Sequence, residues 1–190
     1  MRVRIALFRG INVGGRSVLP MKDVVAILGD LGARSVKTYI QSGNAAFVSG
    51  ERDTSRLSAE IRREVKKRRG FEPHVLLLEF EDLERMIRRN PFPEAVAEPG
   101  ALHAGFLASP PARPNLKALE ALKTASERFR LVDRVFYLHA PEGTGRSKLA
   151  ASVERLLGVP MTDRNWRTVG KILEMARSLI EPPVQDRERK

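Results

Sequence analysis

Residues 3–30, VRIALFRGINVGGRSVLPMKDVVAILGD, contain the first strand, loop and helix from which the fold is predicted. Residues 3–8 place Val3, Ile5 and Leu7 on one side and Arg4, Ala6 and Phe8 on the other, which is the period of a half-buried strand. After a glycine-rich loop, Pro20 suits the first turn of a helix, and apolar residues then recur at helical spacing. Gly32 provides the left-handed stop that ends this helix. The loop is longer than most connections between a strand and a helix, and such loops are often functional.

The residues that follow predict a complete ferredoxin-like unit. Further strands are predicted at residues 36–40, 45–48 and 75–78, with a helix between Asp53 and Gly70. The pair Ser42-Gly43 forms a tight turn between the second and third strands. The element order strand, helix, strand, strand, helix, strand defines the ferredoxin-like motif. We therefore expect residues 1–79 to form one such unit.

After this unit the same order of elements begins again. Residues 80–100 read as a bridging helix and linker, residues 101–181 as the second unit, and residues 182–190 as a flexible tail. Apolar residues near the end mark two helices, with no fourth strand before the tail. The predicted fold class is α+β, with two ferredoxin-like (βαββα-type) units, the second lacking its last strand and ending in two helices.

Composition and charge narrow the possible functions. The chain has 34 Lys and Arg against 23 Asp and Glu, a formal net charge of +11, which favours anionic partners. It contains no cysteine, so disulfides, thiolate nucleophiles and zinc–thiolate sites are excluded. The three histidines are scattered on predicted strands, and none stands at metal-ligand spacing, so we expect no metal. No signal peptide or long apolar run is present, which predicts a cytoplasmic protein without a membrane partner.

Two glycine- and amide-rich segments are expected to converge in the first unit. In the ferredoxin-like order the first two strands run parallel with the third between them, so the loops that follow them lie together. These loops are Gly10–Gly15 and Gln41–Asn44. Their glycines allow backbone amides to turn toward an anion, although each segment is also explained as a plain turn. The glycine spacing matches neither the dinucleotide fingerprint nor the Walker loop.

Two later segments carry further cations. In Arg146-Ser147-Lys148, a serine that caps a helix is flanked by two positive charges, which suits a phosphate at a helix N-terminus. Farther on, Thr162 or Asp163 is expected to cap the last helix, whose first turn then presents Arg164 and Asn165. The predicted ligand-binding residues are Arg9, Asn12, Gly14, Gly15, Gln41, Ser42, Gly43, Asn44, Arg146, Ser147, Lys148, Arg164 and Asn165.

Several functions fit these residues. The first is binding of a phosphorylated or other anionic small ligand at a cleft lined by Gly, Asn and Arg. The second is binding of nucleic acid through the basic stretch 62–69, although aromatic residues, on which bases stack, make up only 6% of the chain. A third alternative is a structural or partner-binding protein in which the glycines and amides join two subdomains. Whether the protein is an enzyme stays uncertain: no catalytic base stands beside a candidate nucleophile. The residues also indicate no particular cofactor, reaction or oligomeric state.

Four segments together resemble a known family. LFRGINVGGRSVLPM, LGARSVKTYIQSGNAAF, GRSKL and TDRNWRTVGKILEMA are similar to the signatures of bacterial proteins grouped as domain of unknown function 1697. The resemblance implies an α+β fold related to paired ferredoxin-like units, and no established activity. Asp163 departs from the small residue expected at its position. The matching positions are Arg9, Gly10, Asn12, Gly14, Gly15, Tyr39, Gln41, Ser42, Gly43, Asn44, Ser147, Lys148, Arg164, Asn165, Trp166 and Thr168.

Overall fold

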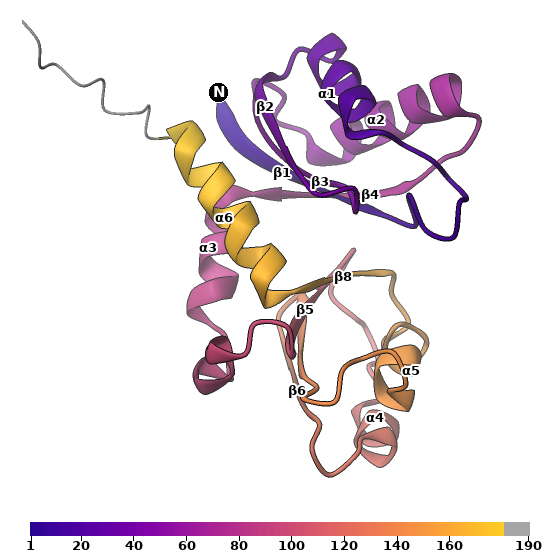
Figure 1. The fold of residues 1–190 in the computed structure, drawn as a ribbon, viewed down its shortest axis with the longest axis vertical. Helices are drawn as coiled ribbons and strands as arrows, with labels where there is room; N and C mark the ends of the chain where they lie inside the picture. The colour runs from indigo at the N-terminus through magenta and orange to yellow at the C-terminus, as the bar shows by residue number, and fades with distance from the viewer. Residues whose placement is uncertain (181–190) are drawn as a thin grey trace, which may run out of the picture. The chain divides into compact units, whose positions relative to one another are not determined.

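A computed structural model describes residues 1–180, which form two four-stranded antiparallel sheets and six α-helices. The α+β class is therefore confirmed. Figure 1 shows the elements of the first half, which are β1 (Arg2–Arg9), α1 (Met21–Asp30), β2 (Arg34–Tyr39), β3 (Asn44–Ser49), α2 (Thr54–Arg69) and β4 (His74–Glu79). They follow the predicted element order, and the strands lie in the order β2-β3-β1-β4.

Local signals in the sequence determine both ends of α2. The Asp53 side chain caps α2 by accepting hydrogen bonds from the N–H groups of Ser55 and Arg56, at 2.9 and 3.0 Å. Gly70 ends the helix in the left-handed conformation, and its N–H donates to the carbonyl of Lys66. Both ends of α2 therefore lie where the sequence predicts them.

The first sheet is buried on both faces around its central strand. Ala6 and Phe8 of β1 pack with α1 and α2 in one apolar cluster, whose largest other members include Leu28, Phe47 and Ile61. The opposite face of the sheet carries Ile5, Leu7 and Ala46, and each of these is 0% exposed. No residue of β1 between positions 4 and 8 is available to solvent.

The second sheet repeats this arrangement. Its elements are β5 (Leu102–Leu107), α4 (Leu116–Leu122), β6 (Arg128–Val132), β7 (Val135–His139), α5 (Lys148–Leu157) and β8 (Met161–Asn165), with α6 (Trp166–Ile180) after them. The strand order β6-β7-β5-β8 corresponds to that of the first sheet. Leu119 of α4 and Val153 of α5 pack with Leu138 of β7 in one apolar cluster.

The prediction that the second unit lacks its last strand is wrong. Strand β8 pairs with β5 from Met161 to Asn165, with Met161 opposite Leu107. The Met161 side chain reaches the neighbouring Gly105, where a Cβ atom would lie only 2.2 Å from its sulfur. The sequence of β8, MTDRN, does not alternate between apolar and polar residues. The strand lies at an edge of the sheet, where Thr162 is buried and Asp163 is exposed. Pairing with β5 determines this strand more than its own residues do.

The chain divides into two compact units. Unit 1 consists of Met1–Leu83 together with the part of α6 from Lys171 onward, and unit 2 consists of Glu84–Gly170. The division falls within α6 and within α3 (Phe80–Arg88), which is followed by the short 3₁₀ helix η1 (Pro93–Ala97). The predicted tail, residues 182–190, lies outside the described residues.

Candidate functional site

The long loop between β1 and α1 is a small hairpin. The N–H of Asn12 donates to the carbonyl of Ser17, and the N–H of Arg16 donates to that of Val13, both at 3.1 Å. Gly14 and Gly15 form the two-residue tip, with φ values of 58° and 72°. Positive φ at both central residues is what a type I′ turn requires, and glycine adopts it without strain. The tip is exposed, so the backbone of both glycines faces solvent.

The side chain of Asn12 joins this hairpin to the turn after β2. Its Nδ2 atom donates to the carbonyl of Leu19 at 2.9 Å and to that of Gln41 at 2.7 Å, while its Oδ1 atom accepts from the N–H of Leu19 at 2.8 Å. The two loops therefore meet, as the topology predicts. Because these contacts engage both ends of the amide, they favour a structural role for Asn12.

The turn after β2 is also packed by the chain itself. A Cβ atom on Gly43 would lie 2.5 Å from Cβ of Phe8 and 2.7 Å from Cδ1 of Ile11, so the site accepts only glycine without displacement. Asn44 is 0% exposed, and its Nδ2 atom donates to the carbonyl of Tyr39 and to Oγ of Ser42. The predicted residues of this turn are thus brought together with the hairpin, by contacts that build the loop.

In unit 2, the segment before α5 places two cations at a helix N-terminus. Ser147 caps α5, since its Oγ atom accepts from the N–H of Ala150 at 2.9 Å. Arg146 and Lys148 on either side are exposed, and neither forms an ion pair within residues 1–180. The N–H groups of Lys148 and Leu149 have no hydrogen-bond acceptor in the same part of the chain. This helix end therefore presents two exposed cations, while Leu149, whose N–H lies in the first turn, is itself 0% exposed.

Arg164 and Asn165 lie on β8, where the sequence predicted the first turn of the last helix. The cap is Asn165, whose Oδ1 atom accepts from the N–H of Thr168 at 3.0 Å, so the prediction of Thr162 or Asp163 as the cap is wrong. Burial lowers the pKa of Arg164 to about 10 in spite of the charge of Asp163, and Nη1 of Arg164 donates to the carbonyl of Asp163. Trp166 is 8% exposed, as expected for a residue that anchors α6 in the core.

The register of the second sheet places the start of the loop before α5 and the end of β8 at the same end of the sheet. Leu102, the first residue of β5, is paired with His139 at the end of β7, and the next residue, His103, is paired with Asn165 at the end of β8. The loop after β7, which leads to Ser147, therefore starts at the same end of the sheet at which β8 ends. The candidate residues from Arg9 to Asn44 belong to unit 1, and those from Arg146 to Asn165 belong to unit 2.

A histidine–carboxylate pair at this edge was missed in the sequence. Nδ1 of His103 lies 2.7 Å from Oδ2 of Asp163, and the His103 side chain is 11% exposed. Burial lowers the pKa of His103, but the hydrogen bond and charge of Asp163 outweigh it, so the pKa is raised. The pair depends on the register between β5 and β8, and it could be found from the sequence only once β8 is recognised as a strand.

The cations of the basic helix α2 are largely paired on unit 1 itself. Arg62 and Lys66 lie 3.5 and 3.8 Å from the carboxylate of Glu72. Arg68 pairs with Asp30 and Arg69 with Asp23 of α1. Arg63 and Lys67 have no such partner within residues 1–180. This pairing is the pattern of a solvated helix face, and it leaves few cations for a nucleic-acid backbone.

The central strands of unit 1 also differ from those of RNA-recognition modules. Such modules stack bases on exposed aromatic residues of their sheet. Here the face opposite α1 and α2 presents Ile5, Leu7 and Ala46, which are aliphatic and fully buried. Stacking of bases on this sheet face is therefore not available.

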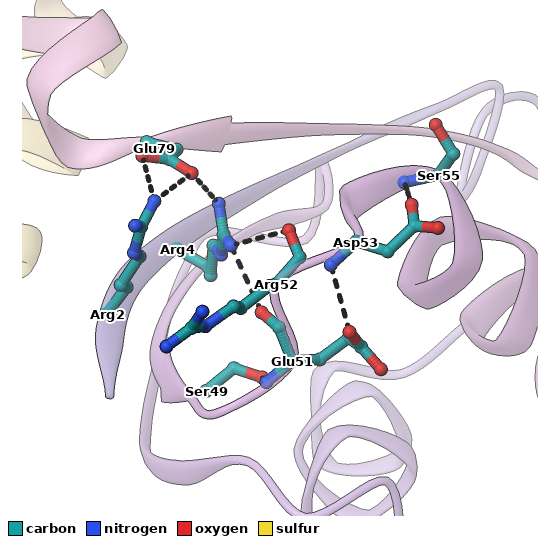
Figure 2. A network of polar contacts seen from close by, with 8 residues as sticks. All are labelled: Arg2, Arg4, Ser49, Glu51, Arg52, Asp53, Ser55 and Glu79. Atoms are coloured by element: carbon teal, nitrogen blue, oxygen red, sulfur yellow. Dashed lines mark hydrogen bonds and ion pairs between the residues drawn. The ribbon is translucent and has the colours of Figure 1, made fainter.

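Figure 2 shows a polar network in unit 1 that the sequence reading did not single out. Arg4 is 0% exposed, yet its guanidinium is held by Glu79 at 2.5 Å and by the carbonyls of Glu51 and Arg52. Arg2 binds the same Glu79 carboxylate at 3.0 Å. Burial alone would raise the pKa of Glu79, but the hydrogen bonds and charges of Arg4 and Arg2 have the larger combined effect, so the pKa is lowered. The network ties β1 and β4 to the segment that enters α2.

Residues 1–180 contain neither a metal-binding cluster of side chains nor a membrane-spanning helix. No group of three or more His, Cys, Asp or Glu side chains within residues 1–180 is arranged to hold a metal ion. None of the helices in this range is both long and apolar enough to cross a membrane.

Comparison with known proteins identifies relatives. Residues 1–137 match the model of a family described as "Protein of unknown function (DUF1697)". A solved structure, described as that of conserved bacterial protein SP0830 from Streptococcus pneumoniae, matches with a TM-score of 0.68 and 24% sequence identity, over 92% of this chain and 98% of that one. At this identity the likeness shows the fold alone. No curated protein matches the chain.

Proposed function

Because the chain belongs to the DUF1697 family, whose description states no function, we propose from its own residues that it binds a phosphorylated or other anionic small ligand at the N-terminus of α5. The residues that hold the anion are Arg146 and Lys148, together with the first N–H groups of the helix. Asn12, Gly43 and Asn44 are not part of this proposal, since their contacts lie within the loops of unit 1.

The observation that carries the proposal is the difference between two equivalent helix ends. In unit 1, α2 follows the third strand of its sheet, and Asp53 places its own carboxylate on the N–H groups of Ser55 and Arg56. In unit 2, α5 has the same place in the element order, but its cap is the neutral Ser147. A carboxylate at the cap already satisfies the positive end of the helix, whereas a serine leaves that end available to an external anion.

The neighbouring charges support the same assignment. Arg146 and Lys148 are exposed and have no carboxylate partner within residues 1–180, while most cations of α2 do. Two cations beside free N–H groups at a helix N-terminus form the usual environment of a bound phosphate. An arginine can bind two phosphate oxygens at once, and a lysine adds a point charge. The ligand class is therefore a small molecule with a phosphate or similar group.

Calorimetric titration of the full chain with pyrophosphate tests this proposal. We expect binding by the unchanged protein and a loss of affinity of at least about tenfold in Arg146→Ala/Lys148→Ala, since charge-assisted hydrogen bonds contribute about 1.5–3 kcal/mol each. The matched control is Arg63→Ala/Lys67→Ala, which removes the same charge from exposed and unpaired positions on α2. Equal weakening in both variants would show that net charge alone attracts the anion, and would refute the site.

A second variant separates the cap from the ligand. Ser147→Asp retains a residue that caps helices as well as serine does, but places a negative charge where the anion would bind. We expect this variant to keep the thermal midpoint of unit 2 and to lose pyrophosphate binding. Unchanged binding in Ser147→Asp would contradict the proposal.

A further inference from the structure

Three residues with exposed apolar side chains lie next in sequence to Asn12 or to the residues that it contacts. Val13, Val18 and Ile40 are 70%, 52% and 50% exposed. Val13 follows Asn12 directly, and Val18 and Ile40 precede Leu19 and Gln41, whose carbonyls both accept hydrogen bonds from Asn12. These three residues, here named the hairpin surface, therefore lie around one anchored point of unit 1. Single exposed apolar residues are ordinary, but a group gathered on one small loop pair is not.

The backbone that presents the hairpin surface is pinned and strained. The Val13–Arg16 bridge and the three hydrogen bonds of Asn12 hold the hairpin in one conformation. Ile40 has a φ of 47°, and Ser17 has a φ of 51°. A β-branched residue at positive φ is a real outlier, and such strain tends to persist where a function retains it. Folding gains nothing from an exposed isoleucine at such a position, so its presence points to binding.

Two exposed cations lie on the segments next to the hairpin surface. Residues 9–22 contain no Asp or Glu, and the next residue, Asp23, is paired with Arg69. Arg16 on the hairpin and Lys22 at the start of α1 are exposed and unpaired within residues 1–180. Exposed apolar side chains with two cations nearby in the same loops are complementary to an acidic partner that carries an apolar side chain.

We infer that the hairpin surface docks an acidic segment of another protein, in which an apolar side chain packs on Val13 and Ile40 while flanking carboxylates face Arg16 and Lys22. The fixed hairpin reduces the entropy cost of binding, since the loop is ordered before the partner arrives. This surface lies in unit 1 and is independent of the anion site proposed at α5.

The test compares two labelled polymers by fluorescence anisotropy on the full chain. A copolymer of Glu and Tyr carries carboxylates with apolar anchors, whereas poly-Glu carries carboxylates alone. We expect the copolymer to bind more tightly than poly-Glu, and Val13→Ser/Ile40→Ser to weaken copolymer binding by at least about fivefold, as loss of a buried apolar anchor does. Both replaced side chains are exposed, so the variant is expected to fold as the unchanged protein does.

The matched control is Val25→Ser/Val96→Ser, which removes two apolar side chains that are 40% and 43% exposed elsewhere on the chain. This control is expected to bind the copolymer as the unchanged protein does. Three results would overturn the inference: copolymer binding that Val13→Ser/Ile40→Ser leaves unchanged, tighter binding of an oligo-dT single strand that the same variant abolishes, and a dimer in sedimentation analysis that this variant dissociates. The last two would assign the surface to nucleic acid or to a second copy of the chain.

Discussion

Replacing Gly43 by alanine tests how the two loops of unit 1 pack together. The residue has a φ of 77°, and its carbonyl accepts a hydrogen bond from the N–H of Phe8 at 2.8 Å. An added Cβ atom would lie 2.5 Å from Cβ of Phe8 and 2.7 Å from Cδ1 of Ile11. Because the Cβ of Phe8 is attached to the central strand of the sheet, the new atom cannot be accommodated by a side-chain rotation. The strand or the turn must move instead.

The expected cost follows from two contributions. A side chain in the left-handed region costs about 1–2 kcal/mol, and overpacking a well-filled core costs about 1–3 kcal/mol more. Gly43→Ala should therefore lower the free energy of unfolding of unit 1 by about 2–5 kcal/mol. Gly10→Ala is the matched control, since its φ is 72° but nothing lies within 4 Å of the added atom. It should cost only about 1–2 kcal/mol.

Hydrogen exchange measured by mass spectrometry on peptides from β1 and β3 reports the opening free energy of this unit directly. Exchange should quicken far more in Gly43→Ala than in Gly10→Ala. Equal protection in the two variants would refute the close approach of the turn to β1.

Three further predictions concern the polar contacts. Asn12→Ala removes three hydrogen bonds and should destabilise unit 1 by about 2–3 kcal/mol in urea unfolding followed by circular dichroism. His103 has a raised pKa in the folded protein, so its pair with Asp163 stabilises unit 2 fully below about pH 6.5 and loses this effect as the pH rises through the folded pKa. Urea unfolding followed by tryptophan fluorescence at about pH 6 and about pH 8 should show this loss, and His103→Gln should remove it. Glu79 has a lowered pKa, so its contribution is present above about pH 4.5 and is lost at more acidic pH. Glu79→Gln should cost about 3–5 kcal/mol in urea unfolding, because it leaves the charge of the fully buried Arg4 without its carboxylate.

The parts of the fold that the sequence predicts are those with local signals. The cap at Asp53, the stop at Gly70 and the cap at Ser147 each depend on residues within one helical turn, and all three lie where expected. Strand β1 also lies where the sequence predicts a strand, but the expectation of a half-buried strand is wrong, because residues 4–8 are buried on both faces of the sheet. Such signals are read without knowing the rest of the fold.

Several features that depend on distant segments have no local signal, although the topology does predict that the two loops of unit 1 meet. Strand β8 has one apolar residue, Met161, and its backbone is paired with β5, so its polar sequence alone predicts the start of a helix. The pair of His103 and Asp163 exists only because of that register. Asn12 was recognised as a candidate, but its partners are main-chain carbonyls, which no residue pattern reveals. A polar loop residue therefore reads the same in sequence whether it binds a ligand or its own chain.

The central claim is that α5 presents an anion site, and amide chemical shifts test it most directly. In a titration of ¹⁵N-labelled protein with pyrophosphate at constant ionic strength, the N–H signals of Lys148 and Leu149 should move most and saturate together. In the same titration, the N–H signals of Ser55 and Arg56 at the carboxylate-capped end of α2 should stay in place. Shifts spread evenly over the basic surface, or larger at α2 than at α5, would contradict the account.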